Sequence, residues 1–349
     1  MRCKTFFRAC ALAACVWLAG AAASGDVGLA GAGQETPKQE QGKDNKQGPK
    51  LPPDEAKAAN KIITATDAAG KLAASAEFLK KYPKSEVRRQ VAEHVAAHVS
   101  AVQDAGQRIT LGEQYTAVFN GPGEADLVAG PVLDAYITTE RNADAFRAGA
   151  AYLQAHPDEV GVMRSLAVAA GNAAIKGNTE YVAQGRQYAA KAAELIEADK
   201  KPAAWEAAQW AEYKTKWLPA IYREAGVLAM RAGDSAASKA NMEKAAALKS
   251  TDPVVYIILS DAANQEYSAA ARAYQAMPAG AEKTARLKEV EGLLDRVIEV
   301  SAQAVAMMEG NAQYDAARQQ IRQDLEGYYK YRRGSTQGLQ ELIDKYKKP

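Results

Sequence analysis

Residues 222–253 decide the fold, and they read YREAGVLAMRAGDSAASKANMEKAAALKSTDP. The stretch consists largely of Ala, with Lys, Glu, Met and Leu, which all have high helix propensity. It is interrupted at Gly233-Asp234 and closed by Pro253. A similar composition, with Gly and Pro as isolated punctuation, continues from about residue 54 to the end, and period-two alternation of β-branched residues is scarce. The sequence therefore predicts an all-α domain.

Three apolar stripes at helical spacing follow this stretch. The first predicts a helix of roughly seven turns and contains Leu287, Val290, Leu294, Val297, Ser301, Val305 and Met308. The second contains Ile321, Leu325, Tyr328 and Tyr329, and the third Leu339, Leu342, Ile343 and Tyr346. Between the last two, Arg332-Arg333, Gly334 and Ser335 predict a basic helix end, a left-handed cap and a new N-cap. A C-terminal capping helix is therefore expected at about residues 335–347.

A repeated helix end indicates stacked hairpins. The segments FLKKYP, residues 78–83, and YLQAHP, residues 152–157, end in prolines 74 residues apart, with Pro122 between them. The steps of 39 and 35 residues are close to the period of helix-pair solenoids. A single helix hairpin has one apolar face to bury, so neighbouring hairpins must stack to complete a core.

The spacing within residues 222–253 resembles the tetratricopeptide repeat of exported bacterial proteins. The pattern is Tyr222-x3-Gly226-x6-Gly233-Asp234, followed by Lys244-Ala245 and by Pro253. The resemblance implies an aromatic anchor, a glycine where two helices cross closely, a Gly-Asp turn, an Ala in the second helix and a closing Pro. The closing Pro lies about three residues later than usual, and Ser238 occupies the position where the family most often has Ala.

Weaker copies extend the resemblance over about two thirds of the mature chain. One runs through Gly171, Gly177-Asn178 and Lys191-Ala192, and another helix begins at Pro253. The segment FLKKYPKS, residues 78–85, is similar to repeat ends of periplasmic assembly and cell-envelope coordinator proteins. The expected architecture is a tetratricopeptide-like α-α superhelix. Another α-helical array or an irregular helical bundle is the alternative.

The N-terminus is typical of a secretory signal peptide, residues 1–23. Arg2, Lys4 and Arg8 precede an apolar run of 15 residues that ends in three small residues. This run falls short of the ~20 residues that cross a bilayer, so we expect export to the periplasm or the exterior with no transmembrane span after signal removal. Residues 24–56 are rich in Gly, Gln, Lys, Pro and Glu and predict a disordered linker before the helical domain at 57–349.

Cysteine and charge exclude several kinds of chemistry. Cys3, Cys10 and Cys15 all lie in the leader, so the mature chain would have no disulfide or thiol nucleophile. Residues 12–15, Leu-Ala-Ala-Cys, also resemble a bacterial lipoprotein processing box, which would leave Cys15 lipidated, but apolar residues follow Cys15 where a polar linker is expected. The formal charge of +2 includes three cations of the leader, so residues from Ser24 onward carry −1. A nearly neutral body argues against nucleic acid as a partner.

No catalytic or cofactor signature occurs in the sequence: there is no phosphate-binding loop, nucleophile elbow or His-Glu-x-x-His motif. We therefore expect neither an enzyme nor a cofactor. His94 and His98 would share one helix face, the spacing of a two-His metal clip, but His156 is the only further histidine. A packed or solvated pair is favoured over a metal site.

Aromatic residues cluster before Pro219. Trp210, Tyr213 and Trp217 have i, i+3, i+7 spacing and share one helix face, with Trp205 close by. An aromatic stripe of this kind usually packs in the core. Alternatively, Trp205 and Trp210 form an exposed ledge that binds a partner.

The predicted function is an exported protein–protein interaction scaffold that binds an envelope protein or an extended peptide in a helical-repeat groove. The resemblance implies groove-facing positions at Arg223, Arg231, Asp261, Asn264 and Asn172. The alternative is a helical hydrolase or carbohydrate-active enzyme with paired carboxylates in a cleft. The sequence leaves the oligomeric state open.

Overall fold

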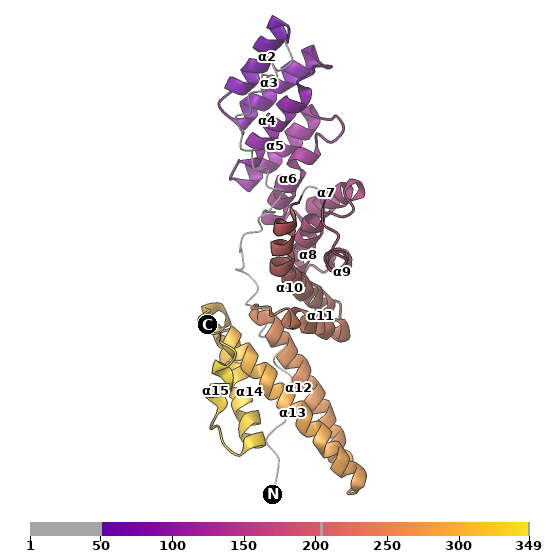
Figure 1. Cartoon of the computed structure of the whole chain (residues 1–349), viewed down its shortest axis with the longest axis vertical. Coiled ribbons are helices and arrows are strands. Elements are labelled where there is room, and N and C mark those ends of the chain that lie inside the picture. Colours follow the sequence, from indigo (N-terminus) through magenta and orange to yellow (C-terminus); the bar gives the residue numbers. More distant parts are fainter. Residues whose placement is uncertain (1–50, 203–204, 348–349) are drawn as a thin grey trace. The chain divides into compact units, whose positions relative to one another are not determined.

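The computed structural model describes residues 51–202 and 205–347. The expected signal peptide, Cys15 and nearly all of the expected linker lie outside these residues. Within them the chain is all-α and contains no strand, and successive helices pack as antiparallel neighbours, which confirms the predicted helix-hairpin array (Figure 1). None of the described helices is long and apolar enough to cross a membrane.

The chain divides into two compact units, and the division falls within α8. The N-terminal unit holds described residues 51–169, 197–202 and 205–206, and the C-terminal unit holds residues 170–196 and 207–347. The helices up to the division are α2 (Pro53–Thr64), α3 (Ala68–Lys81), α4 (Arg88–Ser100), α5 (Ala105–Val118), α6 (Asp126–Thr138), α7 (Asn142–Ala155) and α8 (Val160–Ile175). Those that follow are α9 (Val182–Glu197), α10 (Ala207–Arg231), α11 (Ser235–Ala247), α12 (Pro253–Ala276), α13 (Ala281–Met307), the 3-10 turn η2 (Ala312–Tyr314), α14 (Asp315–Arg333) and α15 (Leu339–Asp344).

In the N-terminal unit, glycines let successive helices cross closely. A Cβ added at Gly112 of α5 would lie 2.2 Å from Val132 Cγ2 of α6, and one at Gly149 of α7 would lie 2.7 Å from Leu166 Cδ1 of α8. Contacts this short leave no room for a side chain. The helices α3 and α7 end immediately before the Tyr-Pro and His-Pro pairs of the repeated helix ends.

In the C-terminal unit, the hairpin of α10 and α11 has the features that the repeat-like spacing predicts. A Cβ added at Gly226 would lie 2.7 Å from Cε of the fully buried Met242, so α10 and α11 cross closely there. Gly233 adopts a left-handed φ of +76° in the turn, and Asp234 caps α11 by accepting a hydrogen bond from Ala237 N at 3.0 Å. At the closing position, Pro253 begins α12.

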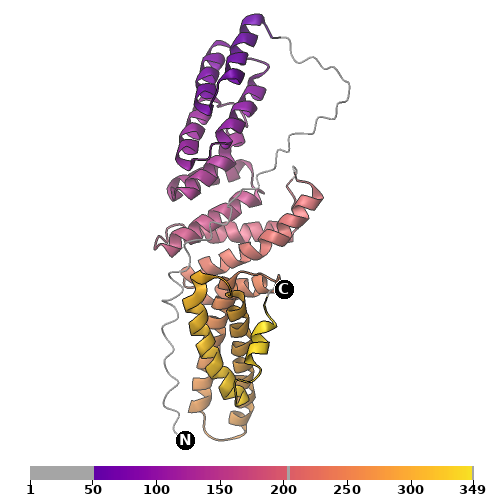
Figure 2. The same ribbon diagram turned by 90° about the vertical axis from the view of Figure 1, so that its left-hand side faces the viewer.

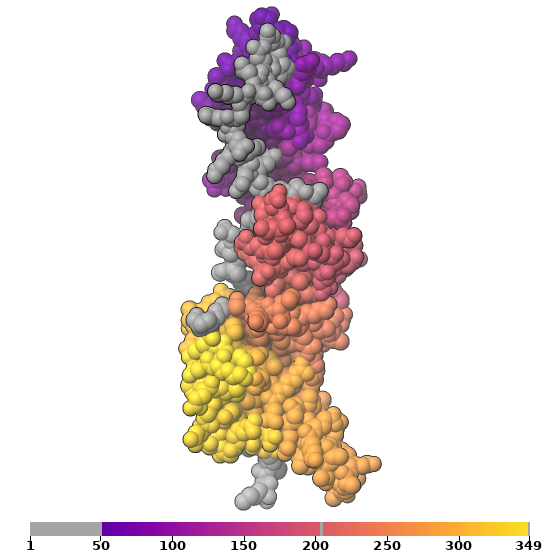
Figure 3. All heavy atoms as spheres, viewed as in Figure 1, coloured from indigo at the N-terminus to yellow at the C-terminus, as the bar shows by residue number. Residues whose placement is uncertain are grey.

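Two long helices and a shorter one complete the C-terminal unit. The helices α12, α13 and α14 lie side by side, and the hairpin of α12 and α13 extends past α14 (Figures 2 and 3). The predicted stripe of α13 is buried from Val290 to Val305, whereas Leu287 is partly exposed near the hairpin tip. Gly334 adopts the predicted left-handed cap, with φ +82°.

The prediction that Ser335 is the N-cap of a new helix is wrong. The Ser335 hydroxyl accepts a hydrogen bond from Gln337 N at 3.3 Å within a turn. A second left-handed glycine, Gly338, then precedes α15, which runs from Leu339 to Asp344. Two left-handed glycines four residues apart therefore delay the new helix by one turn.

Candidate functional site

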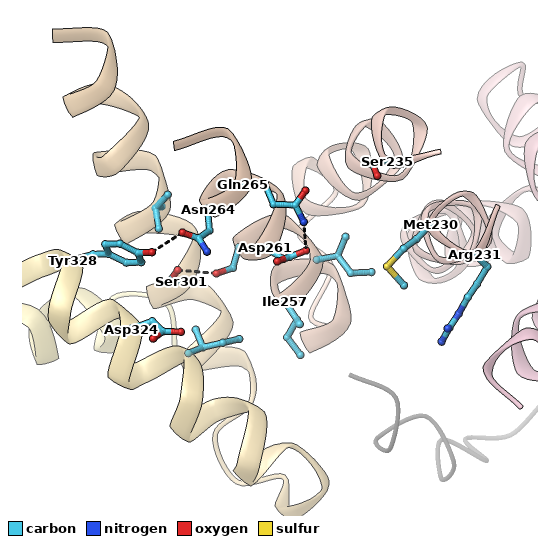
Figure 4. Close-up of a pocket in the computed structure, with 14 residues that line it drawn as sticks. Met230, Arg231, Ser235, Ile257, Asp261, Asn264, Gln265, Ser301, Asp324 and Tyr328 are labelled. Atoms are coloured by element: carbon cyan, nitrogen blue, oxygen red, sulfur yellow. Dashed lines mark hydrogen bonds between the residues drawn. The ribbon is translucent and has the colours of Figure 1, made fainter. Parts of the chain in front are cut away.

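A pocket of about 350 Å³ lies in the C-terminal unit (Figure 4). The end of α10, the start of α11, and α12, α13 and α14 form its walls. Its apolar lining is Met230, Ile257, Ile258, Val297 and Ile321. Its polar lining is Arg231, Ser235, Ser260, Asp261, Asn264, Gln265, Ser301, Asp324 and Tyr328.

Helical spacing explains why these residues converge. On α12, Ile257, Asp261 and Asn264 stand at i, i+4 and i+7 and therefore share one face. The lining residues of α14, Ile321, Asp324 and Tyr328, stand at i, i+3 and i+7, and those of α13 are one turn apart. Each of the three helices thus presents one face to the pocket.

One wall of the pocket is fixed by a hydrogen bond between helices. The hydroxyl of Tyr328 on α14 donates to Asn264 Oδ1 on α12 at 2.6 Å (Figure 4). Burial raises the pKa of Tyr328 to about 12, with smaller contributions from the charge of Asp324 and from Tyr267. The phenol therefore stays protonated at neutral pH and holds the Asn264 amide in one orientation.

The inner wall contains a buried pair of hydroxyls. Ser260 Oγ on α12 and Ser301 Oγ on α13 are 2.7 Å apart, and their residues are 7% and 4% exposed. This bond joins α12 to α13 between two buried side chains.

Two carboxylates face the pocket without a cationic partner among the described residues. Asp261 Oδ2 accepts one hydrogen bond from Gln265 Nε2 at 2.7 Å, and burial raises the pKa of Asp261 above its ordinary value. Asp324 accepts hydrogen bonds from Gln320 Nε2 at 3.2 and 3.3 Å. Arg231, the last residue of α10, also lines the pocket, and Figure 4 shows it apart from Asp324 and Tyr328.

The structure brings three of the predicted groove residues together: Arg231, Asp261 and Asn264. Arg223 does not line the pocket, because it forms ion pairs with Glu224 at 2.6 Å and with Asp252 at 3.1 Å. Asn172 is exposed on α8 and also lies outside the pocket.

The aromatic cluster before Pro219 is largely packed. Trp210 is 3% exposed and stacks on Tyr213 with ring centroids 5.8 Å apart, so its indole is not accessible to a partner. This agrees with the core interpretation of the aromatic stripe rather than with an exposed ledge. Trp205 is half-buried in the N-terminal unit.

The histidines of α4 lie together but gather no further ligands. The rings of His94 and His98 have centroids 4.5 Å apart, and His98 Nδ1 donates to the carbonyl oxygen of His94 at 2.8 Å. Burial, followed by the charge of Lys71, lowers the pKa of His94. No group of three or more potential metal ligands occurs in the part of the chain that the structure describes.

A second cavity, of about 360 Å³, lies in the N-terminal unit between α5, α6 and α7. Much of its lining is alanine and glycine. Its acidic residues have partners: Glu113 accepts from Tyr136 at 3.0 Å, and Asp126 lies 3.0 Å from His156 Nε2. This cavity therefore presents fewer unsatisfied groups than the pocket of the C-terminal unit.

Sequence reasoning missed Asp324, Tyr328 and the serine pair as pocket residues. In the sequence, Tyr328 belongs to an apolar stripe, and Asp324 lies one turn after Ile321 of that stripe. Ser301 carried a usable signal, because it is the single hydroxyl in the apolar stripe of α13. A polar residue at a core position calls for a buried hydrogen-bond partner.

Comparison with known proteins adds little to this geometry. No family model matches the chain, and no curated protein matches it. Among solved structures, it is similar to a monomeric mutant of IFIT1 with m7Gppp-AAAA, at 13% sequence identity and a TM-score of 0.33 over 80% of this chain. The chain spans 56% of the length of that structure. At this level of similarity, IFIT1 indicates nothing about what this chain binds. The fold itself defines the class, an all-α array of helix hairpins.

Proposed function

We propose that this protein is an exported, non-enzymatic scaffold of the tetratricopeptide-like type, which binds a segment of an envelope protein or an extended peptide. The single observation that carries the proposal is the pocket of the C-terminal unit. It combines an apolar lining with polar side chains that converge from α10, α12 and α14. Peptide grooves of helical arrays use this combination, with apolar anchors for affinity and polar groups for orientation.

Two features of the sequence support the finer parts of the proposal. The leader at residues 1–23 supports export, and the near-neutral charge of the remaining chain argues for protein rather than nucleic acid as the partner. The close crossing at Gly226 and the turn at Gly233-Asp234 support a tetratricopeptide-like hairpin. Cleavage of the leader is tested by mass spectrometry of the protein isolated from the native cell, with Ser24 as the expected first residue.

Affinity capture from native envelope extract tests the binding function. The bait is the mature chain, and the pocket variant combines Arg231→Ala with Asn264→Ala. The matched control is Arg272→Ala, an exposed cation of α12 that does not line the pocket. The wild-type and control chains are expected to retain one common partner that the pocket variant loses. If all three chains retain the same proteins, this result contradicts the pocket as the binding site.

The same pocket supports a second candidate function, a hydrolase with paired carboxylates. Asp261 and Asp324 line one cavity, and burial favours the protonated form of Asp261, as a general acid requires. Hydrolysis of a panel of nitrophenyl glycosides and esters tests this alternative. Turnover that is lost in both Asp261→Asn and Asp324→Asn would replace the scaffold proposal.

A further inference from the structure

Asp261 is the most informative group in the pocket, and like Asp324 it has no cationic partner among the described residues. Several partly buried acids elsewhere in the described chain pair with an arginine: Glu124 lies 2.7 Å from Arg88 Nε, Asp134 lies 3.2 Å from Arg108 Nη1, and Asp295 lies 3.0 Å from Arg332 Nε. Asp261 has only the amide of Gln265. Asp261 is half-buried, and partial burial of a carboxylate without a counter-charge costs free energy that a single neutral hydrogen bond recovers only in part.

A second, independent observation comes from the serine pair. Two hydroxyls that bond to each other use one hydroxyl hydrogen and leave the other available. Ser260 and Ser301 are both more than nine-tenths buried and both line the pocket, and their mutual bond is the one their hydroxyls make. The remaining hydrogen can donate to an acceptor that enters the pocket, and the backbone carbonyl of a peptide is such an acceptor.

A third observation, the apolar lining and the volume of the pocket, limits the size of the occupant. Ile257, Val297 and Ile321 are nearly fully buried and present only their pocket-facing surface. A cavity of about 350 Å³ is near the lower end of the range for ligand sites, so it admits one or two side chains rather than a folded domain.

We infer that the occupant is an extended peptide segment in which a lysine or arginine stands next to an aliphatic residue; this rests on the proposed binding function. The cationic group meets Asp261 and Asp324, the aliphatic side chain packs on Ile257 and Ile321, and a carbonyl of the segment accepts from the serine pair. Arg231 lies at the α10 border of the pocket and disfavours a second cation there.

Binding of defined probes to the mature chain, residues 24–349, tests this inference by calorimetry. The probes are acetyl-Ala-Leu-Lys-Ala-Ala-amide, the same peptide with norleucine or Glu in place of Lys, and cadaverine. We expect the Lys peptide to bind about tenfold more tightly than the norleucine peptide, since charge-assisted hydrogen bonds are stronger than neutral ones. The Glu peptide should bind weakest.

Two variants locate the cation. Asp261→Asn is expected to reduce the affinity for the Lys peptide to that of the norleucine peptide, with an unchanged or higher Tm because an unpaired charge is removed. The matched control is Glu282→Gln, which removes an exposed acid of α13 outside the pocket. It should leave the Lys peptide affinity unchanged.

Three outcomes overturn the inference. Equal binding of the Lys and norleucine peptides leaves the binding function intact but contradicts the cationic residue. Cadaverine binding as tightly as the Lys peptide contradicts a peptide occupant. Binding of none of the probes also contradicts the inference, and the affinity capture described above then decides the proposed function separately.

Discussion

Gly185→Ala tests how closely the helices of the C-terminal unit cross. Gly185 lies in α9, and a Cβ added there would be 2.4 Å from the Cβ of Ala170 on α8 and 3.2 Å from Leu228 Cδ1 on α10. Carbon atoms in contact are about 3.5–4.0 Å apart. The Cβ of Ala170 is fixed to its backbone and cannot rotate away, so α8 and α9 must separate by about 1 Å.

The expected magnitude follows from two opposing effects. Overpacking of a core costs about 1–3 kcal/mol, whereas Gly→Ala in a helix favours folding by about 1 kcal/mol. Because neither Ala170 nor the fully buried Leu228 can give way freely, we expect a net loss of about 1–2 kcal/mol. For a unit of this size, that loss lowers Tm by about 2–8 °C.

Gly292→Ala is the matched control, because Gly292 lies within α13 and nothing stands within 4 Å of an added Cβ. We expect it to raise Tm by about 2–4 °C. Thermal unfolding of residues 24–349, which lack Trp17, is followed by tryptophan fluorescence in a Trp205→Phe background, so that the signal comes from Trp210 and Trp217 of α10. Equal stabilisation by both substitutions would refute the close crossing of α8 and α9.

Three further predictions concern single groups. Arg223→Ala is expected to destabilise the fold by about 3–5 kcal/mol in urea unfolding, because it leaves the carboxylate of Glu224, which is 3% exposed, without its counter-charge; a loss below 1 kcal/mol would contradict a structural role. Lys71→Met should cost about 1–3 kcal/mol in the same assay, since Lys71 Nζ donates to the carbonyl oxygens of Ile62 and Ile63 at the end of α2, at 3.1 and 2.8 Å; unchanged stability would show that water replaces both bonds. Burial raises the pKa of Asp261 in the folded state, so protonation of Asp261 favours folding. As the pH falls toward about 4, the wild type should therefore gain stability relative to Asp261→Asn, and its affinity for the Lys peptide should fall. Urea midpoints that change in parallel for the two chains over this pH range would contradict the raised pKa.

The sequence predicts the helices, turns and buried stripes, because these depend on residues that are close together in the chain. The helix, turn and helix of residues 222–253 follow from Gly233, Asp234 and Pro253, which act on the backbone within a few positions. Helix existence and the buried stripe of α13 follow from periodicity in the same way. Local chemistry of this kind can be inferred without knowing the partner helix.

The sequence did not predict the pocket, because the pocket forms from contacts between residues that are far apart in the chain. Asn264 and Tyr328 are 64 positions apart, and Ser260 and Ser301 are 41 apart, so no local pattern joins them. Arg223 is a residue that the sequence predicted for the groove but that the structure places elsewhere. Its place in the repeat-like pattern implied a groove position, but its neighbour Glu224 is buried against Gly171 and draws Arg223 into an ion pair. Only the tertiary structure shows that this arginine has a counter-charge while Asp261 has none.

The proposed function places a peptide in the pocket between α12 and α14. Intermolecular NOEs between isoleucine methyls of the mature chain, labelled with ¹³C, and the Lys peptide report this placement. We predict NOEs from Ile257 and Ile321 to the leucine methyls of the peptide, and none from Ile62 or Ile63 of the N-terminal unit. NOEs confined to isoleucines that do not line the pocket would contradict peptide binding in this pocket.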